Sequence, residues 1–220
     1  MVEAVASILG NSSGMCDVLV CMDNDDPVRG WVQLPHVTCL RGPHLSFCQW
    51  VNAGVKAFLH DYYVFAWGAD DVRYTTPGWD ELVLQHLTEK DQMIYGPDGI
   101  QDEKLPTHPF IGCGVPRALG YLIQPNLKHY FADNWVQRLG ARTGKLKYVP
   151  ELVIQHQHHS RNPTKIDLVY QEAEKHYQHD VTAFAEGVFD EATGLDKTGD
   201  AAEQLRRWMA AQATPALRPS

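Results

Sequence analysis

Acidic side chains gather at the ends of two apolar runs of the sequence. Asp70 and Asp71 stand side by side after YYVFAW (62–67), just before a segment with a helical pattern. Three further aspartates follow the β-rich run DVLVCM (17–22), namely Asp23, Asp25 and Asp26. Carboxylate oxygens, with an imidazole and open coordination positions, suit a divalent ion such as Mn²⁺ or Mg²⁺ that also holds a diphosphate. The two clusters therefore predict a cation site.

Two histidines, His156 and His158, end a third apolar run, KLKYVPELVIQHQHH. Residues two apart on a strand point to the same face, so both side chains face one way. We expect His156 to be a third ligand of a cation bound by Asp71. A zinc site built from the HQHH segment is an alternative, although no CxxC or HExxH motif accompanies it. A second alternative is that His156 binds no metal and is an exposed histidine or a hydrogen-bonded histidine of the core.

Each cluster taken alone could also have a purely structural role, because aspartates at strand ends commonly form turns and cap helices. Three clusters at strand ends favour a shared site instead. In an open parallel sheet, ligands bind outside the carboxyl ends of the strands, where the loops converge beside helix N termini. The function of these residues therefore depends on whether the fold brings those strand ends together.

The elements that must position these residues alternate along the chain. Strands are expected at 17–22, 36–40, 62–67 and 93–96, with a strand pair or bent strand over 145–159. Helices are expected at 2–9, 46–60, 133–144, 166–189 and 201–211. The segment 96–109 is dense in Gly, Pro and Asp, which predicts a long loop, and long loops tend to be functional. The alternation indicates an α/β domain with a largely parallel sheet.

The composition narrows the class of protein. No apolar stretch of the 220 residues reaches the roughly 18 that a membrane span needs. The first residues lack the pattern of a secretory signal, so we expect a cytoplasmic location. Five cysteines without close pairs argue against a disulfide framework. A net charge of −8 makes nucleic acid a less favoured partner.

The order of the motifs resembles that of the GT-A glycosyltransferases, particularly the family 2 type in the short versions common in actinobacteria and their phages. The motifs are the acidic loop after 17–22, then NAG, GADD, TPGWDE, ADNWV and a last strand with histidine, and they span residues 1–160. The resemblance implies a Rossmann-like GT-A domain over 1–165 with a mostly parallel central sheet. A C-terminal helical extension over 166–213 and a disordered tail over 214–220 would follow.

The resemblance also implies a function. Such enzymes transfer a sugar from a nucleotide diphosphate sugar to a hydroxyl acceptor, and here Mn²⁺ or Mg²⁺ would assist. The acceptor would be a glycan, a protein or, less favoured in view of the negative charge, a modified DNA base. Two alternatives stay open: a degenerate module that binds a nucleotide sugar or glycan without turnover, and a metal-dependent phosphohydrolase.

Roles for the first acidic residues follow from the same resemblance. Asp23 would contact the base or ribose of the donor, with Asp25 nearby. Asp70 would hydrogen-bond the ribose, and Asp71 would bind the metal as in the family's Asp-x-Asp motif. Here Ala69 stands where the first Asp of a strict motif would be, which leaves the division of labour between Asp70 and Asp71 open.

Roles for three later residues are implied in the same way. Asn52 matches the family's Asn-x-Gly helix motif, although it is equally an ordinary polar helix residue, and Arg41 would face the diphosphate. Asp133 matches the base of inverting members, which removes the proton that makes a sugar hydroxyl a poor nucleophile. The family usually has Glu-Asp here, whereas this chain has Ala132 before Asp133. A helix cap is the alternative for Asp133.

The first strand of the family has no counterpart in the sequence. Such proteins begin with a β-strand that ends in a polar turn and lies inside the sheet, whereas this sequence begins with the helical pattern over 2–9. The resemblance therefore implies that the natural protein starts upstream of Met1, with about 10 to 25 more residues that include a strand of typical length.

Overall fold

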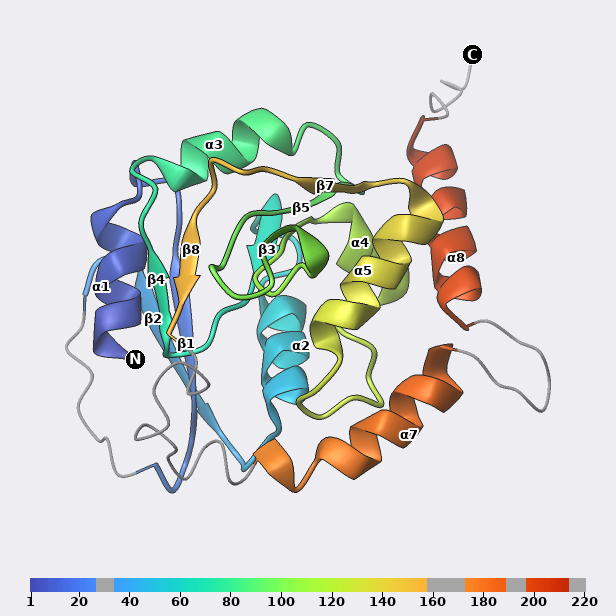
Figure 1. The fold of residues 1–220 in the computed structure, drawn as a ribbon, viewed down its shortest axis with the longest axis horizontal. Coiled ribbons are helices and arrows are strands. Elements are labelled where there is room, and N and C mark those ends of the chain that lie inside the picture. The colour runs from blue at the N-terminus through green and yellow to red at the C-terminus, as the bar shows by residue number, and fades with distance from the viewer. Residues whose placement is uncertain (27–33, 158–172, 189–196, 214–220) are drawn as a thin grey trace, which may run out of the picture.

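A computed structural model describes residues 1–26, 34–157, 173–188 and 197–213, and it is a mixed α/β structure (Figure 1). The helices in these ranges are α1 (Val2–Gly10), α2 (Phe47–Ala57), α3 (Trp79–His86), α4 (Gly114–Leu119), α5 (Ala132–Thr143), α7 (Tyr177–Val188) and α8 (Lys197–Ala213), with a 3₁₀ turn η1 (Asp102–Lys104). The strands are β1 (Val18–Asp23), β2 (Val37–Gly42), β3 (Val64–Ala66), β4 (Val72–Tyr74), β5 (Met93–Tyr95), β6 (Phe110–Gly112), β7 (Leu146–Tyr148) and β8 (Ile154–His156).

The strand pairs do not form the mostly parallel sheet that the sequence pattern predicts. Among the described residues, β1–β2 and β5–β7 are parallel, whereas β3–β6, β5–β6 and β4–β8 are antiparallel. A parallel neighbour requires a crossover that carries the chain back to the same end of the sheet. The loop between β5 and β6 contains only η1, so β6 returns antiparallel between β5 and β3. The four-stranded sheet, in the order β3-β6-β5-β7, is therefore mixed, and the pairs β1-β2 and β4-β8 form two separate two-stranded sheets in the described part of the chain.

Most of the expected elements are present, and their ends follow local chemistry. Helix α5 buries Trp135, Val136 and Leu139 at the spacing of one helical face and ends before Gly144, whose φ of +70° is a left-handed conformation that glycine tolerates. The expected helix over 166–189 is described only in its last part, as α7, because residues 158–172 lie outside the described ranges. The expected tail at 214–220 also lies outside them.

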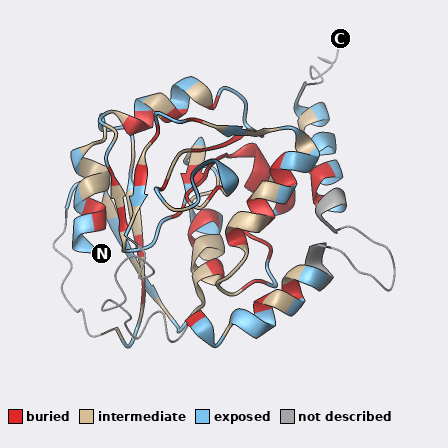
Figure 2. Ribbon diagram, viewed as in Figure 1, coloured by how far each residue is buried: buried red, intermediate tan, exposed pale blue. Residues whose placement is uncertain are grey.

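The last helix shares a hydrophobic core with the rest of the protein. Figure 1 shows α4, α5 and α8 grouped on one side, and Figure 2 shows buried residues gathered in α4 and α5. Leu205 and the alanines before it on α8 belong to the same core cluster as Trp135 of α5. Two hydrogen bonds reinforce the packing, since Gln204 and Arg206 donate to backbone carbonyls of α4 and α5. The C-terminal helices are therefore packed elements of this core.

A close approach of two backbones at Gly96 lets β8 run beside the chain that leaves β5. A Cβ atom at Gly96 would stand 1.8 Å from the carbonyl oxygen of Leu152, so only glycine fits. Just beyond this point, the Ile154 N–H donates to the Pro97 carbonyl at 3.0 Å. The contact thus aligns β8 with the segment that carries the candidate site. Among the described helices, none combines the length and the apolar character that crossing a bilayer requires.

Candidate functional site

Two aspartates and two histidines from four separate parts of the chain meet at the end of β8. Asp71 lies between β3 and β4, Asp98 follows β5, His108 precedes β6, and His156 ends β8. One ligand atom each from Asp98, His108 and His156 lies within 4.8 Å of the others. Asp71 joins through the other side of the His156 ring, where its Oδ2 is 3.4 Å from Nε2. We call these four residues the Asp/His cluster.

The backbone holds the Asp/His cluster together. The His156 N–H donates to the Asp98 carbonyl at 2.9 Å, and the Gln157 N–H donates to the Asp71 carbonyl at 2.8 Å. In the β4–β8 ladder His156 stands opposite Val72, the residue after Asp71. The end of β8 therefore lies between the other two segments, and the two predicted metal ligands, Asp71 and His156, are brought together.

Asp98 presents one carboxylate oxygen to the cluster. Its Oδ1 accepts three backbone N–H bonds, at 2.7 to 3.1 Å, from the turn that follows it: Ile100, Gln101 and Asp102. Its Oδ2 is buried without a hydrogen bond within the described residues and lies 3.6 Å from His156 Nδ1. Although burial opposes ionisation, His156 and the backbone N–H groups lower the pKa of Asp98 below its ordinary value. Asp98 is thus a fixed carboxylate.

His108 is buried, with 7% of its surface exposed, and neither ring nitrogen has a hydrogen-bond partner in the described part of the chain. Burial and then the charge of His156 lower the pKa of His108 to about 4, so its ring is neutral at pH 7. A neutral imidazole with an open lone pair beside a carboxylate is suited to bind a metal ion. The residues of the cluster therefore fit a bound divalent cation.

Sequence reasoning did not find Asp98 and His108 as site residues. Both lie in the loop at 96–109, whose length alone marked it as functional. The PDG and THP tripeptides around them read as turns, and nothing local shows that the loop folds back onto β8.

His156 is held between two carboxylates. Burial alone would lower the pKa of its ring, but Asp71 and Asp98 outweigh burial and raise that pKa to about 9. The ring is therefore charged at pH 7 in the metal-free protein. His158, the other histidine of the predicted strand end, lies outside the described residues.

Asp133, the predicted base, lies in the first turn of α5 but is not its N-cap, a position that Phe131 occupies with a left-handed φ of +66°. The Asp133 carboxylate accepts the Asn134 N–H at 2.8 Å. Burial, with a smaller contribution from the charge of Asp98, raises the pKa of Asp133 above its ordinary value. Its interaction with Asp98 and His156 connects Asp133 to the Asp/His cluster, and a raised pKa is a common feature of catalytic acids and bases.

Helix α7 fixes the segment that leads into α5. Asp180 on α7 is fully buried, and its carboxylate accepts three backbone N–H bonds at 2.7 to 2.9 Å, from Lys128, His129 and Tyr130. The Phe131 ring stacks on the ring of Phe184 with centroids 5.0 Å apart. Two contacts from α7 therefore fix the segment that leads to Asp133 at the start of α5.

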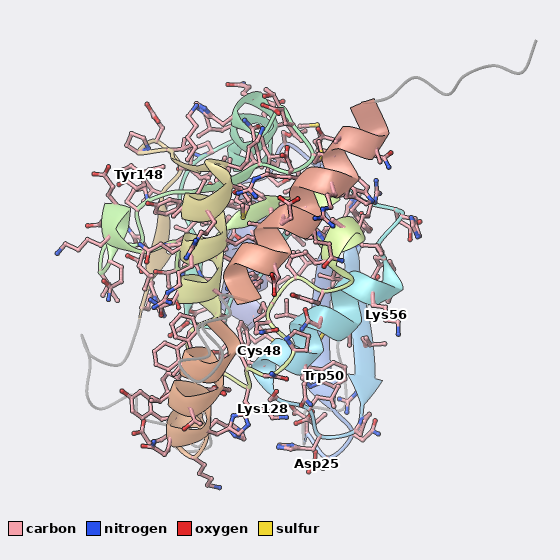
Figure 3. All side chains as sticks on the ribbon, turned by 90° about the vertical axis from the view of Figure 1, so that its right-hand side faces the viewer. Asp25, Cys48, Trp50, Lys56, Lys128 and Tyr148 are labelled. Carbon is pink, nitrogen blue, oxygen red and sulfur yellow. The ribbon has the colours of Figure 1, made fainter. Side chains whose placement is uncertain are left out.

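The predicted donor residue Asp23 is engaged with α2. Its Oδ1 accepts hydrogen bonds from Trp50 Nε1 at 2.9 Å and from the Leu45 N–H at 3.2 Å, while Oδ2 lies 2.7 Å from His44 Nδ1. Asp25 is exposed and groups with Asp23 and His44 at the same place. Figure 3 shows Trp50 and Asp25 toward one end of the molecule. Asp23 therefore anchors the start of α2.

Asn52 is bonded to a neighbouring loop. Its Oδ1 accepts the N–H groups of Leu122 and Ile123, each at 2.9 Å, and its Nδ2 donates to the Ile123 carbonyl at 2.7 Å. These bonds use both acceptor positions and one of the two donor positions of the side chain. Asn52 thus connects α2 to the chain after α4, which is a structural role.

Arg41 and Asp70 are exposed. Arg41 lies on β2, where Nη1 donates to the Asp23 carbonyl at 3.4 Å, so it stands at the carboxyl end of the β1–β2 pair. The Asp70 carboxylate lies 3.6 Å from the amino group of Met1. Asp70 is therefore outside the Asp/His cluster, although the next residue, Asp71, belongs to it.

The arrangement can hold a divalent cation, and the charges of Asp98 and His156 reach Asp133, a carboxylate with a raised pKa. A cation and a base of this kind suit metal-assisted group transfer or hydrolysis. Comparison with models of known protein families and with curated proteins gives no match to this sequence.

Proposed function

We propose that the protein is a metal-dependent glycosyltransferase that moves a sugar from a nucleotide diphosphate sugar to a hydroxyl acceptor. The observation that carries the proposal is the Asp/His cluster with Asp133 close enough to feel the charges of Asp98 and His156, because this reaction needs both a cation site and a base. The motif order that resembles GT-A glycosyltransferases supports the same assignment.

Each part of the cluster has a task in this reaction. A cation bound at the Asp/His cluster would stabilise the negative charge that develops on the leaving diphosphate. Asp133 accepts the proton of the acceptor hydroxyl. Its raised pKa makes the ionised carboxylate a stronger base than that of an ordinary aspartate.

The donor would lie across the carboxyl ends of β1 and β2. These strands are parallel, so Asp25, after β1, and Arg41, on β2, stand at the same edge. The guanidinium of Arg41 suits a diphosphate because its planar donors match phosphate oxygens. Asp70 is proposed to contact the ribose. Asp23 would act indirectly, by holding the start of α2 at this edge.

The proposal is tested by incubating the protein with a panel of nucleotide diphosphate sugars and Mn²⁺, with and without a chelator. The glycosyltransferase forms nucleoside diphosphate together with free or transferred sugar, and only in the presence of metal. Thermal unfolding under the same conditions reports binding, since a ligand at 100 times its Kd adds about 2.7 kcal/mol of stability. Stabilisation without product would indicate the binding module, and inorganic phosphate would indicate the phosphohydrolase.

A further inference from the structure

We propose that Asp98, His108 and His156 are the direct ligands of a transition metal ion, and that Asp71 orients His156 instead of binding the ion. This inference rests on the proposed function in one respect, since it names the ligands and the ion class of the same site. Binding of the ion is measured without a sugar donor, so the two proposals can fail separately.

The three ligand atoms are positioned for one ion. Asp98 Oδ2 and His156 Nδ1 are 3.6 Å apart. Two ligand atoms that each lie about 2.1 Å from an ion at a tetrahedral angle are about 3.4 Å apart, so a small shift completes the pair. His108 supplies the third ligand atom within 4.8 Å of both.

His108 has no other task for its ring nitrogens. The residue is more than nine-tenths buried, its ring meets that of His156 edge to face, and both nitrogens lack hydrogen bonds within the described ranges. Buried polar atoms without partners cost free energy and are rare in native proteins. A metal ion would satisfy one nitrogen of His108 and also Asp98 Oδ2.

The two ring nitrogens of His156 face different carboxylates, which separates their roles. Nε2 faces Asp71 at 3.4 Å, and Nδ1 faces Asp98 at 3.6 Å. A histidine that binds a metal commonly donates its other N–H to a carboxylate, which fixes the tautomer and the ring orientation. With the proton of Nε2 directed at Asp71, the lone pair of Nδ1 is on the side of Asp98.

The ligand types select the class of ion. Mg²⁺ prefers oxygen ligands in an octahedral arrangement, whereas imidazole nitrogens suit transition metals such as Co²⁺ and Zn²⁺. Two of the three proposed ligands are imidazoles. We therefore expect Zn²⁺ and Co²⁺ to bind more tightly than Mn²⁺, and Mg²⁺ to bind roughly 100-fold or more weakly than Zn²⁺.

The experiment uses the 220-residue chain after treatment with a chelator. Co²⁺ is titrated and followed by visible absorption, and Zn²⁺, Mn²⁺ and Mg²⁺ are titrated and followed by calorimetry. Asp98→Asn and His108→Leu should abolish the Co²⁺ bands. Asp71→Asn should keep the bands but weaken affinity by roughly 10 to 100-fold, the usual effect of losing the partner of a metal-bound histidine. His44→Gln, in the group of Asp23, Asp25 and His44, is the control and should leave the Co²⁺ bands and the metal affinities unchanged.

Several results would overturn the assignment. One is an unchanged Co²⁺ spectrum in a folded Asp98→Asn protein, and another is Mg²⁺ binding as tight as Zn²⁺ binding. A third is complete loss of metal binding in a folded Asp71→Asn protein, which would make Asp71 a ligand. Asp98→Asn keeps the side-chain volume, so it serves as the test if His108→Leu does not fold. If the metal binds as expected but no sugar is transferred, only the glycosyltransferase proposal is wrong. If sugar is transferred but the metal does not bind as expected, only the assignment of the metal ligands is wrong.

Discussion

The imidazole rings of His108 and His156 meet edge to face, with centroids 4.9 Å apart and planes inclined at 74°. Their pKa values lie on opposite sides of neutrality, at about 4 for His108 and about 9 for His156. Burial lowers the pKa of His108, which has no hydrogen bond among the described residues. His156 is also partly buried, but it faces two carboxylates, which raise its pKa. At pH 7 the metal-free pair is therefore one neutral ring and one charged ring.

His108→Leu should have opposite effects on the metal-free and the metal-bound protein. Without metal, an apolar side chain of similar volume removes two buried nitrogens that lack partners, so the free energy of unfolding should rise by about 1 kcal/mol. With Zn²⁺, the variant should lose the metal-dependent gain in stability that the wild type shows. Urea unfolding with chelator and with Zn²⁺ measures both. A metal-free variant less stable by 2 kcal/mol or more would indicate that His108 has a structural task.

The metal-free protein should lose stability between pH 6.5 and 9. Asp71 and Asp98 raise the pKa of His156 from 6.5 to about 9, so the folded state holds a proton that the unfolded state has released. The resulting stabilisation, at most about 3 kcal/mol, is fully present below pH 6.5 and disappears as the pH rises through 9. Urea unfolding at several pH values, in chelator, should show this slope in the wild type and a flatter one in His156→Gln. Equal slopes would contradict the prediction.

Asp133→Asn should separate binding from rate. Donor affinity should persist while transfer falls by roughly 100-fold or more, because the amide cannot accept the acceptor proton. Calorimetry with the donor and a product assay measure the two quantities. Glu81→Gln is a matched control, since Glu81 is an exposed acid in the first turn of another helix, α3. A parallel fall in affinity and rate would assign Asp133 to structure or to donor binding.

Asp80→Asn should lower stability without changing metal binding. Asp80 is buried and accepts hydrogen bonds from the Ser12 hydroxyl and from the N–H groups of Ser13 and Met15. Burial opposes ionisation, but these bonds outweigh it and lower the pKa of Asp80 to about 2. Its contribution, about 2 to 3 kcal/mol, is present above pH 4 and is lost as the pH falls through 2.

Thermal unfolding and Co²⁺ titration of the Asp80→Asn protein measure the two quantities. Asp61→Asn, at an exposed position, is the control and should leave both unchanged. A weaker Co²⁺ affinity in the Asp80→Asn protein would show that the loop after α1 influences the Asp/His cluster.

Gly96→Ala should damage both the fold and the metal site. A Cβ would overlap the Leu152 carbonyl, so β8 would have to move away from the segment that carries Asp98. We expect a loss of about 3 kcal/mol or more and a weaker metal affinity, because Asp98 and His156 would separate. Gly10→Ala is the control, since a Cβ there has open space around it. A stable Gly96→Ala protein with normal affinity would show that the two backbones can separate at no cost.

The local part of the structure could be predicted from the sequence. The periodic apolar positions of α5 and the glycine after it define that helix, and the β-rich runs define β1 and β2 within one or two residues. Pairing between distant strands could not be predicted in the same way. Strand β6 is only three residues long, and its place between β3 and β5 depends on contacts far apart in the chain.

The candidate site shows the same division. Asp71 and His156 were predicted as partners because each ends an apolar run, and the β4–β8 ladder brings them together. Asp98 and His108 were not, because their loop has no periodicity and only the fold shows that it meets β8. Asn52 has a suitable side chain for ligand binding, but the backbone at Leu122 and Ile123 uses it instead, and no sequence pattern reveals such a partner.

The packing of α8 has a consequence for how the protein matures during synthesis. Helix α8 packs against α5, the helix that begins at Ala132, and residues 197–213 are synthesised after all of α5. The core between α5 and α8 therefore cannot close while residues 197–213 are still inside the ribosome. A nascent chain that has exposed Asp133 but not α8 would carry an open apolar surface, which is a target for chaperones. The core that α5 shares with α8 is thus completed only after α8 has been synthesised.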